Sequence, residues 1–234
     1  MTRDYRTLKV VDDQRDFDLL APPFNFNAPN LRAHAPEVTG YRLLESLRRR
    51  LGWENYADKR LLDFGCGVRF AQTIYNLDLP FGLYVGVDVH AASIAWLQEN
   101  ACDPRFKFVH IDTPNAIYNP NGAVTDIDAL AAAGVPECDA ASMFSVITHQ
   151  RPDEARLSFT RLRRRVACGG KLYFTAFVDE AIGDYVEGDA KQPGHKSTYH
   201  PAALMDLVET CGWRTISIHH RTKLQQTPFL CAAI

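Results

Sequence analysis

The 234-residue sequence lacks the features that mark several large classes of protein. It has no apolar run long enough to span a bilayer, and its first ten residues are charged, so we expect neither a membrane protein nor a secreted one. Its six cysteines are scattered without a C-x-x-C pair, which argues against a zinc site and a disulfide scaffold and is typical of thiols in the cytoplasm. Lysine plus arginine number 26 against 28 acidic residues, so no general surface for nucleic acid or anionic membranes is expected.

What the sequence does contain is enough apolar material for one ordinary domain. Hydrophobic residues make up 46% and charged residues 23% of the chain, a balance that excludes a disordered protein. Prolines are frequent between residues 21 and 29, where they disfavour a helix or a central strand. We therefore expect an irregular N-terminal arm or cap over residues 1–37 and a single domain over residues 38–234.

Short apolar runs alternate with helical patterns along this domain. The expected strands are 60–64, 83–88, 106–111, 139–146, 172–178, 214–220 and 227–233. The expected helices are 38–51, 70–77, 91–101, 153–167 and 201–211, with a short helical piece around 126–133. Such alternation predicts an α/β fold with a mostly parallel, doubly wound sheet, and the last two strands are spaced too closely for a helical crossover, so they should form an antiparallel hairpin.

The chemistry is expected where the first strand ends, at residues 61–67 (LLDFGCG). Two glycines there allow a tight turn that approaches a ligand closely, and Asp88 at the end of the second strand suits two vicinal ribose hydroxyls. A dinucleotide fingerprint would need a glycine where Phe70 stands, which disfavours a pyrophosphate. The pattern therefore favours a nucleoside ligand without phosphate.

At this point the chain resembles the class I S-adenosylmethionine-dependent methyltransferases, over roughly residues 60–234. The resemblance is carried by five segments in order, 61–67, 84–88, 109–112, 138–146 and 165–172. It implies a Rossmann-like seven-stranded sheet of order 3-2-1-4-5-7-6 and S-adenosylmethionine as the cofactor. One departure stands at Arg69, where the family often has a third glycine, so that side chain must leave the pocket.

The resemblance implies roles for five residues at the methionine end of the cofactor. The backbone around Gly65 and Gly67 would approach the methionine portion. Asp63 would help to hold its ammonium group, directly or through water. Phe144 and Ser145 would line the methionine side beneath the transferred methyl group.

It also implies roles for four residues at the adenosine end. Asp88 would bind the ribose, and Val89 would pack against the adenine. Asp112 would accept a hydrogen bond from the adenine amino group, with Thr113 nearby. Carboxylates and carbonyls suit a cofactor that carries a sulfonium and an ammonium, whereas a phosphate-binding loop would not.

Fewer signals point to the acceptor. His149, just after the fourth strand, is either a general base or substrate contact, or a loop residue bonded to backbone. The long connection 179–200 is either a lid or a surface loop, and the segment 24–30 is a second lid candidate. The candidate substrate contacts in the long connection are Tyr185, His195, Tyr199 and His200.

The expected function is a cytoplasmic methyltransferase for a small-molecule acceptor, without a bound metal, without nucleic acid as substrate and without a membrane partner. The nucleophile could be oxygen, nitrogen or carbon, and the oligomeric state is left open. Two alternatives remain, an NAD-dependent oxidoreductase of related topology and a non-catalytic protein that only binds S-adenosylmethionine.

Overall fold

A computed structural model of the chain describes residues 19–26, 35–188, 196–219 and 225–234. Its centre is a sheet of nine strands, in which β3, β2, β1, β4 and β5 lie side by side and parallel. These strands are β1 (Arg60–Phe64), β2 (Leu83–Asp88), β3 (Phe106–His110), β4 (Cys138–Met143) and β5 (Val166–Val178). The expected order 3-2-1-4-5 of the parallel strands is confirmed.

The expected antiparallel hairpin at the end of the chain is confirmed as β8 (Trp213–Ile218) and β9 (Thr227–Ala233). Strand β9 pairs antiparallel with Lys171–Ala176 of β5, so the sheet reads β3-β2-β1-β4-β5-β9-β8 along this path. This path has the seven-stranded order expected from the sequence, with β9 between β5 and β8.

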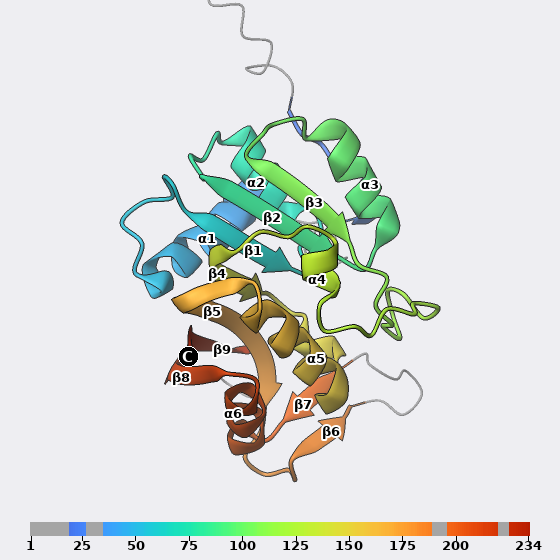
Figure 1. Cartoon of the computed structure of the whole chain (residues 1–234), viewed down its shortest axis with the longest axis vertical. Helices are drawn as coiled ribbons and strands as arrows, with labels where there is room; N and C mark the ends of the chain where they lie inside the picture. The colour runs from blue at the N-terminus through green and yellow to red at the C-terminus, as the bar shows by residue number, and fades with distance from the viewer. Residues whose placement is uncertain (1–18, 27–34, 189–195, 220–224) are drawn as a thin grey trace, which may run out of the picture.

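The long connection after β5 is not a loop throughout. It contains β6 (Tyr185–Glu187) and β7 (Ser197–Tyr199), which pair antiparallel, and β7 pairs parallel with the last two residues of β5. One edge of β5 therefore has β9 as its partner along Lys171–Ala176 and β7 at its last two residues, as Figure 1 shows below the centre of the molecule. The strand β5 is also longer than expected, because it starts before the turn at Gly169, whose φ is 77°.

Helices cover both faces of the sheet (Figure 1). One core lies under α1 (Pro36–Leu51), α2 (Arg69–Asn76) and α3 (Ala91–Asn100), and the other under α4 (Ala129–Ala132), α5 (Pro152–Arg163) and α6 (Pro201–Thr210). Two short 3-10 helices, η3 (Phe24–Phe26) and η5 (Ile147–His149), complete the described elements. Consecutive strand residues point into opposite cores, as period-two geometry requires.

Helix α1 follows directly from local sequence signals. Pro36 stands in its first turn with Glu37, and Gly52 ends it in the left-handed conformation with φ 73°. It crosses α2 where Gly40 faces Thr73, and a Cβ atom on Gly40 would overlap the Thr73 hydroxyl. The two helices approach this closely only because residue 40 has no side chain.

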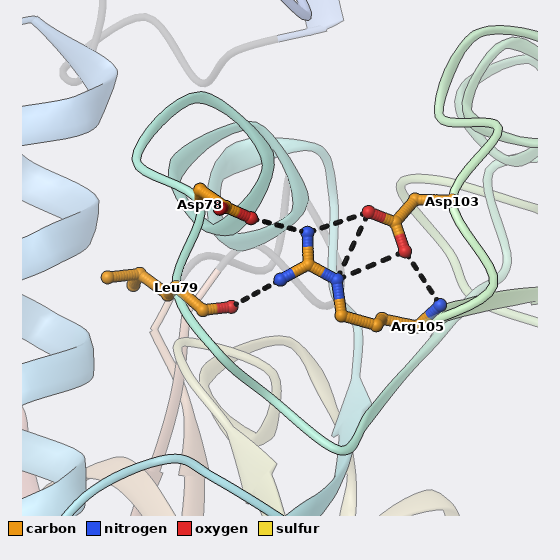
Figure 2. A network of polar contacts seen from close by, with 4 residues as sticks. All are labelled: Asp78, Leu79, Asp103 and Arg105. Atoms are coloured by element: carbon orange, nitrogen blue, oxygen red, sulfur yellow. Dashed lines mark hydrogen bonds and ion pairs between the residues drawn. The ribbon is translucent and has the colours of Figure 1, made fainter. Parts of the chain in front are cut away.

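The turn between α2 and β2 is held to the start of β3 by Arg105. Its guanidinium binds the Asp103 carboxylate at 2.7 Å, the Asp78 carboxylate at 2.8 Å and the Leu79 carbonyl at 3.1 Å (Figure 2). These contacts lie at the amino ends of the strands, away from the edge where ligands of such sheets bind. Among the described residues, no helix has the length and hydropathy needed to cross a bilayer.

Candidate cofactor and acceptor site

The loop after β1 has the conformation that its two glycines were expected to allow. Gly65 and Gly67 have φ values of 72° and 51°, in the region that favours glycine. A Cβ atom on Gly65 would overlap a methyl group of Val146, whereas one on Gly67 would meet nothing within 4 Å. Gly65 is therefore required for packing against the loop after β4, and the space beside Gly67 is open.

Asp88 holds this loop in place. Its carboxylate accepts a hydrogen bond from the Gly67 amide at 2.8 Å and one from the His90 amide at 2.9 Å, one on each oxygen. Each carboxylate oxygen can accept more than one hydrogen bond, so the half-buried group can still receive the hydroxyls of a ribose. The glycine loop and the carboxylate, 21 residues apart in sequence, thus form one unit at the edge of the sheet. Val89 follows at this edge and is half-buried.

Asp63 lies deeper than the sequence suggested. It is 3% exposed, and its carboxylate accepts hydrogen bonds from the Ser142 hydroxyl at 2.6 Å and the Tyr84 hydroxyl at 2.7 Å. Burial raises its pKa to about 6, although both hydroxyls favour the charged form. The group therefore ties β1 to β2 and β4, and contact with a cofactor ammonium stays a prediction.

The loop after β3 is fixed from behind by a buried arginine. Arg161 of α5 is fully buried and donates to the Thr113 hydroxyl at 2.6 Å and to the carbonyls of Val124 and Asp126 at 3.0 and 2.8 Å. Asp112 accepts a hydrogen bond from the Asn119 amide at 2.9 Å on one oxygen. The Thr113 hydroxyl thus holds the loop through its hydrogen bond with Arg161. The second Asp112 oxygen is left to accept a hydrogen bond from adenine.

The loop after β4 carries Phe144 and Ser145. The Phe144 ring lies 5.1 Å from those of both Phe70 and Tyr173. Ser145 has φ 59°, and its amide donates to the Thr175 hydroxyl at 2.9 Å. Gln226, just before β9, forms hydrogen bonds with the Ser145 hydroxyl and with the Thr175 hydroxyl. The ends of β4, β5 and β9 are therefore joined at this point.

His149 ends the short helix η5 and is half-buried. Its ring is edge-on to the ring of Tyr118 at 5.8 Å, and its carbonyl accepts a hydrogen bond from Asn115 at 3.4 Å. Burial, and secondly the Asp88 charge, raise the pKa of Tyr118. Tyr118 therefore contacts the candidate base and feels the charge of Asp88.

Of the candidate substrate contacts in the connection after β5, Tyr199 reaches the residue next to His149. The Tyr199 hydroxyl donates to the Gln150 carbonyl at 2.6 Å, and the side chain is 2% exposed, within a core. Tyr185 packs on Tyr199 at 5.1 Å, and its hydroxyl pairs with Ser197 at 3.0 Å. His200 begins α6 and accepts from the Ala202 amide, and His195 lies outside the described residues.

Two residues in or next to the glycine loop, Arg69 and Cys66, have side chains that are unsuited to catalysis. Arg69 is buried and donates to the Thr39 hydroxyl of α1, so its side chain leaves the pocket as expected. Cys66 is buried, which raises the pKa of its thiol well above the usual range and makes it a poor nucleophile. Within the described ranges, no group of three or more His, Cys, Asp or Glu side chains is arranged to hold a metal ion.

Several of these residues gave no signal in the sequence. Tyr118, Arg161, Thr175 and Gln226 act through partners between 30 and 81 residues away. No periodicity or motif links residues across such separations, and only the packed sheet brings them together.

The fold is that of the class I S-adenosylmethionine-dependent methyltransferases. The chain matches no family model. One similar structure is the magnesium protoporphyrin IX methyltransferase of Synechocystis PCC 6803 with bound S-adenosylmethionine, with a TM-score of 0.52, 12% identity, and coverage of 85% of this chain and 79% of that one. Another is the 1,6-didemethyltoxoflavin-N1-methyltransferase of Burkholderia thailandensis, with a TM-score of 0.55, 16% identity, and coverage of 85% and 78%.

The same fold also supports other reactions. A [4+2]-cyclase, SpnF, is similar at a TM-score of 0.53 and 20% identity, over 76% of this chain and 59% of that one. At these identities the likeness defines the fold, and function has to be argued from the site.

Proposed function

We propose that the chain is an S-adenosylmethionine-dependent methyltransferase that acts on a small-molecule acceptor. The observation that carries the proposal is the joined unit of the open glycine loop and Asp88, in which the carboxylate is fixed by the Gly67 and His90 amides. This unit lies at the carboxyl ends of β1 and β2, where sheets of this topology bind nucleosides.

The chemistry of the donor set fits this cofactor. The side chains at the loop are the carboxylates of Asp88 and Asp112, and the basic residue of the loop, Arg69, is turned toward α1. A cationic nucleoside suits such a site, whereas a pyrophosphate would meet negative charge and no positive partner from the loop. Asp88 would hold the ribose, Val89 and Asp112 the adenine, and Phe144 and Ser145 the methionine end.

When bound, S-adenosylmethionine supplies a methyl group bonded to a positively charged sulfur, which a nucleophile displaces in line. The chain then has to orient the nucleophile and exclude water. Phe144 and Phe70 present an apolar wall, and Ser145 is held by Thr175 and Gln226 at the same edge. His149 would remove a proton only for an acceptor that starts protonated.

The two alternatives are weaker on this geometry. Phe70 is buried against Phe144, where a nicotinamide fingerprint needs glycine and close approach of helix α2. The other alternative is a protein that binds the cofactor without methyl transfer, and the similar fold of a [4+2]-cyclase shows that this fold is not limited to that reaction.

The test is a comparison of ligands by thermal unfolding and calorimetry. A ligand present at about 100 times its Kd should stabilise the folded chain by about 2.7 kcal/mol. We expect S-adenosylhomocysteine to raise the Tm and NAD to leave it unchanged, and the opposite result would refute the proposal. Methyl transfer from labelled S-adenosylmethionine to small phenols, amines and carbon acids then separates an enzyme from a binding protein.

Asp88→Ala is the residue-level version of this test. Loss of the carboxylate leaves the ribose hydroxyls unpaired and releases the Gly67 amide, so we expect S-adenosylhomocysteine affinity to fall by about 1.5–3 kcal/mol. Asp206→Ala, at an exposed position of α6, is the control and should bind as the parent does. A folded Asp88→Ala protein with parental affinity would remove the ribose role.

A further inference from the structure

A groove of about 600 Å³ lies beside α1, outside the site described above. Its walls include Tyr41, Arg42, Arg49 and Arg50 of α1, together with His219 just after β8. The volume is in the range of small-ligand sites. Three arginines and a histidine among its lining residues make the groove basic.

The acidic residue of the groove does not neutralise this charge. Glu45 is bound by Arg48 through two hydrogen bonds of 2.9 and 3.0 Å and by the Tyr56 hydroxyl at 2.7 Å, and Arg48 is not part of the groove. Arg49 comes only to 3.9 Å from Glu45. Within the described ranges, Arg42 and Arg50 have no carboxylate partner.

Of the arginines in the groove, Arg50 is the one that packs against the sheet. Its guanidinium lies over the Tyr173 ring at 5.8 Å, and its Nε atom is buried without a hydrogen-bond partner among the described residues. A buried, unpaired N–H of a charged group is costly, because it has lost water and gained no acceptor. The half-buried guanidinium also lines the groove, where an anionic group would offset its charge through the terminal nitrogen atoms.

The groove adjoins the candidate methyl-transfer site along a line of rings. Phe144, at the methionine end, lies 5.1 Å from Tyr173, and Tyr173 carries the Arg50 guanidinium on its ring. The sheet makes a second link, because Thr175 is paired with Pro228, whose carbonyl accepts from the His219 amide. Neighbouring strands are about 4.8 Å apart, so His219 lies about two strand spacings from Thr175.

We propose that this groove binds an anionic group of the methyl acceptor, a carboxylate or a phosphate, while the part to be methylated reaches Phe144 and Ser145. Arg50 and Arg42 provide the charge, and Tyr41 provides aromatic surface for a ring that carries the anion. The inference rests on the proposed function and adds the substrate class. It makes Arg42 and Arg50 residues that decide specificity.

The test uses the full chain saturated with S-adenosylhomocysteine and three ring probes, isophthalate, phenyl phosphate and neutral isophthalamide. Binding is followed by calorimetry and by the Nε–H signals of ¹⁵N-labelled arginine. We expect an anionic probe to bind and to shift the Arg50 Nε–H signal, and isophthalamide to do neither. Preference between the first two probes distinguishes a carboxylate site from a phosphate site.

Variants make the assignment specific. Arg50→Met keeps a long side chain over Tyr173, and Arg42→Ala changes an exposed position, so each should fold and weaken the anionic probe by about tenfold or more. Arg156→Ala, an exposed arginine of α5 bonded to Thr210, removes the same charge elsewhere and should have no effect.

The outcomes separate this inference from the proposed function. Equal binding of all three probes, no binding of either anion, or no loss in Arg50→Met would overturn the groove assignment while cofactor binding stands. Weaker S-adenosylhomocysteine binding in Arg50→Met, with probe binding unchanged, would overturn it as well, because the arginine would then serve the cofactor. Failure of S-adenosylhomocysteine to bind the parent chain, with the anion still bound, would refute the cofactor proposal and leave the groove as an anion site without a methyl acceptor.

Discussion

Asp63 is a buried carboxylate whose charge is decided by opposing effects. Burial is the larger effect and raises its pKa to about 6, while hydrogen bonds from Ser142 and Tyr84 act in the opposite direction. The sequence placed this residue correctly at the end of the first strand. It could not place the two hydroxyls that occupy its oxygens, because both come from other strands of the sheet.

The raised pKa has a consequence for stability against pH. Between about pH 4 and pH 6 the folded chain binds a proton at Asp63 that the unfolded chain has released, so this contribution to stability is full at low pH and is lost as pH rises through about 6. Asp63→Asn does not titrate. We expect its free energy of unfolding, relative to the parent, to increase by about 2 kcal/mol between about pH 4.5 and about pH 7.5.

Urea unfolding at several pH values measures this difference. Tyr84→Phe is the matched variant, because it removes a hydrogen bond that favours the charged carboxylate and should move the decline to higher pH. A difference between Asp63→Asn and the parent that is flat across the range would contradict the assignment of a raised pKa to Asp63.

At the scale of elements, the contact of α1 with α2 depends on a single missing side chain. Replacing glycine by alanine inside a helix ordinarily stabilises it by up to about 1 kcal/mol. In Gly40→Ala the new methyl group would overlap the Thr73 hydroxyl and lie 3.0 Å from the Thr73 Cβ atom. We therefore expect the opposite sign, a loss of about 1–3 kcal/mol in the free energy of unfolding, because the helices must separate.

The partner variant Thr73→Ala provides the control. It removes the overlapping hydroxyl and leaves only the tight Cβ contact, so Gly40→Ala should cost clearly less in the Thr73→Ala background than in the parent. Chemical denaturation of the four proteins gives this interaction energy. A stabilised Gly40→Ala protein would mean that α1 and α2 do not approach as closely as described.

Elements with strong local signals could be predicted from the sequence, and those without them could not. The five parallel strands and the final hairpin were predicted because apolar runs, glycine turns and helix spacing mark them. Strands β6 and β7 have three residues each, too few for a period to be visible, and β7 exists through its pairing with Phe177 and Val178 of β5. The connection 179–200 was therefore expected to be a loop.

At the scale of the whole molecule, one sheet supplies both hydrophobic cores. Leu61 belongs to the core under α1, α2 and α3, and its neighbour Leu62 to the core under α4, α5 and α6. Opening either core would remove one face from every central strand. The described part should therefore unfold as one cooperative unit, and the single domain over residues 38–234 stays a prediction that this behaviour would test.

The three tryptophans allow this cooperativity to be measured. Trp213 is fully buried in the core under α4, α5 and α6, whereas Trp53 and Trp96 pack against the core on the other face. The double variant Trp53→Phe/Trp96→Phe keeps only Trp213 and reports on the core under α4, α5 and α6. Trp213→Phe keeps the other two tryptophans and reports on the core under α1, α2 and α3. In each protein we expect fluorescence and far-UV circular dichroism to follow one urea transition with one midpoint. S-adenosylhomocysteine should raise the urea midpoint of both signals equally, because the strands at its proposed site contribute side chains to both cores. A fluorescence transition that precedes the loss of circular dichroism in either protein would show that one core opens separately.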